Sequence, residues 1–201
     1  YEIDKIIYSV NQHLAEGTIF QSQWSKRSNY QQGLKKNQLE KTIINAPNPE
    51  IFNRQGKIKF SKKRKTKLVA VSWSDNMRKG FKIYEFLDKN LDFRRYEMTF
   101  IGRTPVKFRN ITWLKPLSSS KLANKLKQQD IFITASQNDP CSNSLLEALH
   151  CGLPAVALDD GGHPEIVGKG GVLFKGKEDI LKKIEKARRD YKKYQKKINL
   201  P

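Results

Sequence analysis

Short apolar runs alternate with helix-like segments from Lys67 onward, and this alternation constrains the fold more than any other feature. Helices are expected near 79–89 and 119–128, after Ser142, and from Pro164. The runs expected to form strands are KLVAVSW, YEMTFIG, NITWL, DIFITAS, PAVAL and GVLF. Strands that alternate with helices form parallel sheets covered by helices. We therefore predict an α/β fold, with a Rossmann-like parallel sheet over residues 67–177.

The sequence before and after this region has a different character. A strand near 18–21, a helix at 25–34 and a strand at 41–45 are too little to enclose a core, so residues 1–48 are predicted to be the end of another domain. The proline-containing, basic residues 49–66 are predicted to be a linker with solvated charges. A basic amphipathic helix is expected over 178–201. The chain begins at Tyr1, and we expect it to be part of a longer protein.

The charge of the chain is strongly positive. It carries 39 basic and 20 acidic residues, a formal net charge of +19. Such a charge favours nucleic acid, an acidic membrane surface or phosphorylated ligands, although a lysine-rich composition alone would also produce it. Cys141 and Cys151 are too few for a disulfide framework or a two-pair zinc site, which fits a reducing cytoplasm. No apolar run approaches the roughly 18 to 20 residues of a membrane-spanning helix.

The richest motif is DPCSNSLLEALHCGLPAVALDDGGHPE, residues 139–165. Pro140 ends the preceding strand, and Ser142 or Asn143 can cap the helix that follows. The free amides of Cys141, Ser142 and Asn143 at this helix start suit a phosphate. Asp139 precedes the helix and Glu147 lies on its second turn, where their carboxylates can accept hydrogen bonds from sugar hydroxyls. Taken singly, each would be an ordinary solvated acid.

Two further loops follow predicted strands. In the first, Gly161 and Gly162 allow close backbone approach, and His163 can donate to a ligand oxygen. Surface or packing roles for that histidine are the alternative. In the second loop, Arg78 and Lys79 precede a helix and can pair with a diphosphate. Loops at the carboxyl ends of parallel strands are where such sheets bind ligands.

These residues resemble the retaining GT-B glycosyltransferases of group 1, or family 4. The resemblance rests on Asp139-x7-Glu147-Ala148, Gly152-Leu153-Pro154, the Gly161-to-Glu165 turn and Lys79-Gly80. It covers residues 67–174 well and the first 45 residues loosely, as the end of the family's N-terminal domain. The sequence departs from the pattern at Ser74, where the family usually has arginine, and at Asp139, where glutamate is commoner.

The resemblance implies the C-terminal half of a GT-B fold and a set of roles. Glu147 would hold the donor ribose, Asp139 would contact the transferred sugar, and Lys79 would neutralise the departing diphosphate. The amides of residues 141–143 would contact the sugar or its phosphate. The implied donor is a UDP- or GDP-sugar, with no prosthetic group and no metal, and the sugar would pass with retention to an acceptor that we expect to be a glycan or lipid-linked.

The resemblance also implies a cytoplasmic protein of polysaccharide biosynthesis, and the basic charge would place it at the periphery of an anionic membrane. The chain by itself is expected to bind without turning over, because a two-domain cleft needs both walls. Two alternatives remain. One is a non-catalytic nucleotide-sugar-binding member of the fold. The other is a basic module for nucleic acid or an anionic surface, although no specific nucleic-acid-reading motif is present.

Overall fold

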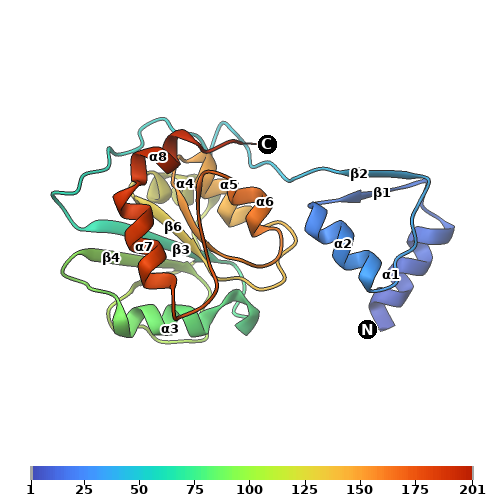
Figure 1. The fold of residues 1–201 in the computed structure, drawn as a ribbon, viewed down its shortest axis with the longest axis horizontal. Coiled ribbons are helices and arrows are strands. Elements are labelled where there is room, and N and C mark those ends of the chain that lie inside the picture. The colour runs from blue at the N-terminus through green and yellow to red at the C-terminus, as the bar shows by residue number, and fades with distance from the viewer. Residues whose placement is uncertain (1, 201) are drawn as a thin grey trace.

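A parallel six-stranded sheet organises most of the chain in the computed structural model, which describes residues 2–200 (Figure 1). The strand order is β5-β4-β3-β6-β7-β8, and every neighbouring pair is parallel. The strands are β3 (Thr66–Ser72), β4 (Tyr96–Gly102), β5 (Thr112–Leu114), β6 (Ile131–Thr134), β7 (Ala155–Leu158) and β8 (Gly171–Phe174). The predicted α/β Rossmann-like sheet is confirmed, with each predicted strand found within about three residues of its expected ends.

Helices cover both faces of this sheet. One face carries α3 (Phe81–Asn90), α7 (Ile180–Arg189) and α8 (Tyr191–Lys196), and Figure 1 shows α7 crossing it. The other carries α4 (Ser119–Lys127), α5 (Asn143–His150) and α6 (His163–Val167). Alternate residues of β3 supply the two cores, because successive side chains of a strand point to opposite faces. Leu68 and Ala70 belong to the first core, Val69 and Val71 to the second.

The strand order reverses between β3 and β6, and this point positions the site. The chain moves outward from β3 to β5, then returns to β6 on the other side of β3. The two crossovers therefore diverge, and a crevice opens beyond the carboxyl ends of β3 and β6, where α/β sheets bind ligands. The loop that contains Lys79 follows β3, and the loop that contains Asp139 follows β6.

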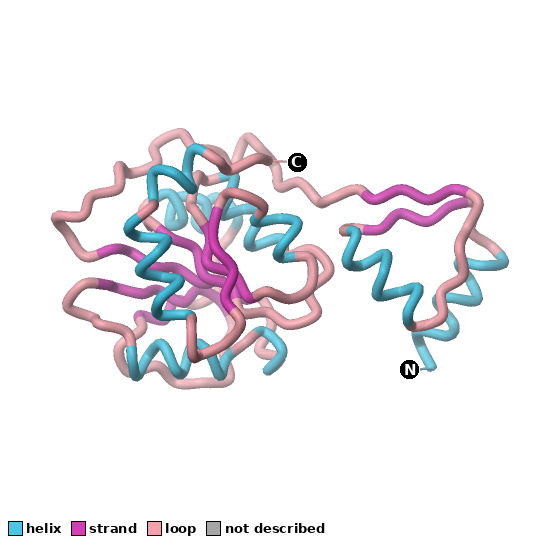
Figure 2. Tube along the Cα trace, in the orientation of Figure 1, coloured by secondary structure: helices cyan, strands magenta, loops and turns pink. Residues whose placement is uncertain are grey.

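The N-terminal segment, residues 2–42, is a small layer beside the sheet. It comprises α1 (Glu2–His13), β1 (Gly17–Phe20), α2 (Gln23–Gln31) and β2 (Leu39–Thr42), with β1 and β2 parallel. Figure 2 shows its two strands well apart from the large sheet. The strand-helix-strand order was predicted, whereas α1 was missed. Its large aliphatic residues recur at helical spacing and stay exposed, namely Ile3, Ile6, Ile7 and Val10, as does Leu14 just after the helix.

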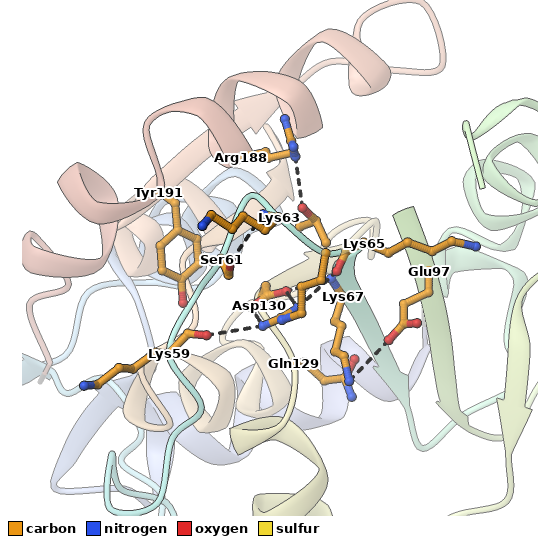
Figure 3. Close-up of polar contacts among 12 residues, drawn as sticks. Lys59, Ser61, Lys63, Lys65, Lys67, Glu97, Gln129, Asp130, Arg188 and Tyr191 are labelled. Carbon is orange, nitrogen blue, oxygen red and sulfur yellow. Dashed lines mark hydrogen bonds and ion pairs between the residues drawn. The ribbon is translucent and has the colours of Figure 1, made fainter. Parts of the chain in front are cut away.

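Residues 43–65 connect the two parts without a helix or strand. The expectation that the charges here stay solvated is wrong for Arg64, which forms an ion pair with the fully buried Asp130. Figure 3 shows Asp130 beside Lys67, at the start of β3. The guanidinium donates to both carboxylate oxygens, at 2.7 and 2.9 Å, and the Lys67 amide donates to one of them at 2.8 Å. A buried carboxylate needs such a charged, two-pronged partner. The connection is thus anchored at the start of β3.

The C-terminal helix differs from the expected single element over 178–201. It is divided at Asp190, whose amide closes α7 on the Lys186 carbonyl and whose carbonyl accepts the Lys193 and Tyr194 amides that open α8. The predicted apolar stripe is buried, including Ile184, Ala187, Tyr191, Tyr194 and Ile198. Most of the basic side chains face outward, but Arg188 is only 16% exposed and donates from Nε to Thr66 Oγ1 of β3 at 3.0 Å.

Candidate functional site

A cleft of about 300 Å³ opens at the reversal point between the loops after β3 and β6. It brings Lys79 together with Asp139 and the start of α5, although Lys79 precedes Asp139 by 60 residues in the sequence. Its lining residues are Val71, Ser72, Trp73, Ser74, Lys79, Ser136, Asp139, Cys141, Ser142, Asn143 and Ser144. Five of the candidate site residues, namely Lys79, Asp139, Cys141, Ser142 and Asn143, therefore share one cavity.

Lys79 and Asp139 form an ion pair across this cleft. The Lys79 Nζ lies 3.1 Å from Asp139 Oδ2; the carboxylate side chain is 11% exposed and the lysine 36%. Gly80 makes this approach possible, since it has a φ of 84° and a Cβ there would lie 2.3 Å from the Ala135 carbonyl oxygen. Only glycine tolerates both conditions. The pair offers one cation and one acceptor to a ligand.

The start of α5 forms another wall of the same cleft. Ser142 occupies the N-cap position, but its side chain makes no capping hydrogen bond, so the predicted side-chain cap is wrong. Its hydroxyl instead lies 3.3 Å from that of Ser144. The first-turn amides of α5 thus have no side-chain cap, and they lie beside the ion pair. The positive end of the helix dipole favours an anion there.

Cys141 lines the same cleft, and burial raises the pKa of its thiol.

Glu147 lies outside this cleft, in an adjoining pocket of about 350 Å³ that also contains Asn45, Ala46 and Pro47. Asn143 lines both cavities, and its side-chain oxygen accepts a 2.9 Å hydrogen bond from Asn45 Nδ2. Within residues 2–200, the buried Oε2 of Glu147 has no hydrogen-bond partner. Burial raises the pKa of this carboxyl to about 7. Glu147 is therefore not an ordinary solvated glutamate, because its buried oxygen can still accept a hydrogen bond from a ligand.

The Gly161-Gly162 turn packs directly against the Asp139 loop. The Gly162 amide donates to the Asp139 carbonyl at 2.9 Å. A Cβ at Gly161, where φ is 63°, would lie 2.5 Å from that same oxygen, and one at Gly162 would lie 2.3 Å from the Pro140 oxygen. The glycines therefore permit a close backbone approach, as predicted, but toward the protein's own loop.

His163 is completely buried at the start of α6. Its Nδ1 lies 3.0 Å from the Leu158 carbonyl oxygen, so we assign the proton to Nδ1. Burial lowers the pKa of the ring, which favours the neutral form. Nε2 is then an acceptor, and it has no partner within residues 2–200. Donation from His163 to a ligand oxygen does not fit this tautomer.

Arg78 and Lys79 face different cavities. Arg78 lines a polar cleft of about 400 Å³ between the sheet domain and the N-terminal segment, together with Tyr8, Trp24 and Asn138 among others. The sequence reasoning missed Trp73, which is 50% exposed in the central cleft. Trp73 is the last residue of a predicted buried strand, and this position could have marked it as a cleft residue.

Residues 2–200 contain no group of three or more His, Cys, Asp or Glu side chains arranged to hold a metal ion. Likewise, none of their helices combines the length and apolar character needed to cross a membrane.

Comparison with known proteins agrees with this geometry. Residues 108–199 match the family model for glycosyl transferases group 1. A probable sucrose-phosphate synthase of Thermosipho melanesiensis is 30% identical over 138 residues, which cover 65% of this chain and 32% of that protein. The chain thus spans about a third of this curated relative.

Solved structures show the same fold. A sucrose-phosphate synthase from Thermosynechococcus elongatus matches 96% of this chain with a TM-score of 0.75 at 13% identity, over 53% of its own length. Anabaena Alr3699/HepE, in complex with UDP and glucose, matches 96% with a TM-score of 0.76 at 17% identity, over 58% of its length. Residues 108–199 therefore carry the sequence pattern of glycosyl transferases group 1, on a sheet domain with the fold of the C-terminal half of GT-B glycosyltransferases.

Proposed function

We propose that this chain is the nucleotide-sugar-binding part of a retaining glycosyltransferase. The donor is a UDP- or GDP-sugar, and the acceptor is a glycan or a lipid-linked sugar. The observation that carries the proposal is the cleft at the strand-order reversal, where Lys79, Asp139 and the uncapped start of α5 meet. A cation and free amides suit a diphosphate, and a carboxylate suits sugar hydroxyls.

The proposed roles follow from the two cavities. The diphosphate would lie between Lys79 and the α5 amides, with the transferred sugar at Asp139 in the same cleft. Glu147 would accept from the ribose in the adjoining pocket, where its Oε2 lacks a partner among residues 2–200. As the bond from the sugar C1 to the diphosphate breaks, negative charge grows on the leaving group. A fixed cation and fixed amides stabilise that charge without reorganising.

The opposite wall of the catalytic cleft is proposed to belong to a larger N-terminal domain. The N-terminal segment supports this idea because large apolar side chains stay exposed on α1, just after it, and on β1 and β2: Ile3, Ile6, Ile7, Val10, Leu14, Ile19 and Leu39. Faces of this kind are normally covered in a stable protein. We therefore expect the 201-residue chain to bind donor and to show no sugar transfer at an enzyme-like rate.

Calorimetric titration with UDP, GDP and their sugar conjugates tests the donor site. We expect saturable binding to one nucleotide series, weakening as salt is added because diphosphate contacts are ionic. A folded sample that binds none of these ligands would refute the proposal. Retention is tested separately, by the anomeric configuration of the product formed by a two-domain protein.

An anionic membrane surface is a further proposed partner, with a cytoplasmic location. A groove of about 620 Å³ lies between the connecting segment and the α7–α8 junction, beside the stacked rings of Phe60 and Tyr191. Its charged lining residues are Lys62, Lys63, Lys192, Lys193 and the ion pair of Arg189 with Asp190. Clustered cations attract acidic lipid headgroups. We expect co-sedimentation with phosphatidylglycerol vesicles and not with phosphatidylcholine vesicles. Equal recovery with both would contradict the proposal.

A further inference from the structure

Glu165 makes an unusual pair of contacts across the molecule. It lies on α6, yet its two carboxylate oxygens accept from the first two amides of α2, which lie 142 and 141 residues earlier in the sequence. Oε2 accepts from the Gln23 amide at 2.8 Å, and Oε1 accepts from the Trp24 amide at 2.6 Å. From the sequence we expected this glutamate to orient neighbouring amides or to cap its own helix, and the contact with α2 was not predicted.

The contact completes the cap of α2. The N-cap Ser22 already accepts from the Ser25 amide at 2.9 Å through its hydroxyl. Ser22 and Glu165 thus divide the free amides of the first turn between them. A carboxylate at this position is also attracted by the positive end of the helix dipole, and charge-assisted hydrogen bonds are the stronger kind.

The same carboxylate stands at one end of a continuous chain of contacts to the cleft. The start of α6 holds the Asp139 carbonyl through the Gly162 amide, and the Asp139 side chain holds Lys79. Gly162 also lies against the N-terminal segment, since a Cβ there would come within 3.3 Å of Ser22 Oγ. The start of α6 and the N-terminal segment are therefore closely packed, and neither can shift far without breaking these contacts.

We infer that Glu165 is a positioning residue that ties α2 to the donor cleft and so sets where the wall formed by the N-terminal segment stands. The hydrogen bonds show that Glu165 joins α6 to α2. That the cleft beside it binds a sugar donor rests on the proposed function. The link between α6 and α2 also accounts for the cleft beside Arg78, which is bounded by α2 on one side and the Asn138-to-Pro140 loop on the other.

The experiment separates tethering from simple helix capping. In Glu165→Ala the amides of residues 23 and 24 should exchange hydrogen roughly tenfold faster or more, and small-angle scattering should show a broader, larger particle. In Glu165→Ala with Gln23→Glu, the new acid in the first turn restores a favourable interaction with the helix dipole without a cross-link. Exchange should then recover in part while scattering stays broad. Glu50→Ala, which removes an exposed carboxylate in the connecting segment, is the control.

Three outcomes would overturn the inference. Unchanged exchange and scattering in Glu165→Ala would mean that the contact does not form in solution. Recovery of compact scattering in the double variant would reduce Glu165 to a helix cap. Loss of UDP affinity without a change in scattering would make it a ligand-binding group; we expect that affinity to change by less than about threefold. Failure of the parent chain to bind any nucleotide would refute the proposed function and leave the scattering result readable.

Discussion

Replacing Glu147 with glutamine should make the chain more stable at pH 8 and should weaken its binding of a nucleoside diphosphate. The pKa of the carboxyl is raised to about 7 in the folded chain, against an ordinary value of 4.5, by burial. Between these values the folded state holds a proton that the unfolded state has lost. The free energy of unfolding therefore falls as pH rises through this window. The stability that the protonated carboxyl allows is fully present below pH 4.5 and is lost above pH 7, where the folded chain must bury a charged carboxylate.

Glutamine is neutral at every pH and removes this penalty. After allowing for the partial exposure of the side chain, we expect a gain of about 1 to 2 kcal/mol at pH 8 and almost none at pH 4.5. Binding should change in the opposite sense, because an amide is a weaker acceptor for ribose hydroxyls than a carboxylate. A charged hydrogen bond contributes about 1.5 to 3 kcal/mol, so the Kd should rise roughly 10- to 100-fold.

Urea denaturation at several pH values, with calorimetry at pH 8, would measure both effects, and Glu50→Gln is the matched control at an exposed position. A residue kept at a cost in stability for the sake of ligand binding is typical of a functional site. If Glu147→Gln keeps the pH dependence of the parent, the carboxyl does not titrate as described. If its Kd is unchanged, the proposed ribose contact is wrong.

Replacing Lys79 with alanine should remove most of the affinity that the diphosphate contributes. We expect UDP binding, or GDP binding if that is the preferred nucleotide, to weaken roughly 10- to 100-fold, while the nucleoside alone binds within about twofold of the parent. The salt dependence of binding should also decrease, because one ionic contact is lost. Lys82→Ala is the control, since that lysine is exposed on the first turn of α3.

Asp139→Asn should have a contrasting effect. The carboxylate pairs with Lys79 at 3.1 Å, so its neutralisation leaves the ammonium group free for phosphate. Affinity for the free diphosphate should stay equal or rise, whereas any added affinity for the sugar conjugate should fall. Calorimetry with UDP and a UDP-sugar separates the two quantities. A parallel loss of affinity for both ligands in Asp139→Asn, or equal losses for nucleoside and diphosphate in Lys79→Ala, would contradict the proposed division of the cleft.

Much of the sheet domain could be predicted because its signals are local. The runs YEMTFIG and GVLF coincide with β4 and β8, since continuous apolar runs between turn residues indicate buried parallel strands. The division of the last helix at Asp190 and the capture of Arg64 by Asp130 could not be predicted. The spacing of apolar residues indicates neither a break within a continuous helical stripe nor an ion pair between residues 66 apart in the sequence.

The candidate site divides in the same way. The sequence by itself determined which groups are available: an acid before a helix, another on its second turn, a lysine after a strand and a double glycine. Tertiary structure alone decided that Lys79 meets Asp139, that Glu147 lies in a separate pocket with an unpartnered oxygen, and that Glu165 reaches α2. The physical reason is that residue type and spacing govern local conformation, whereas ion pairing, desolvation and cross-segment capping arise only when packing brings distant segments together.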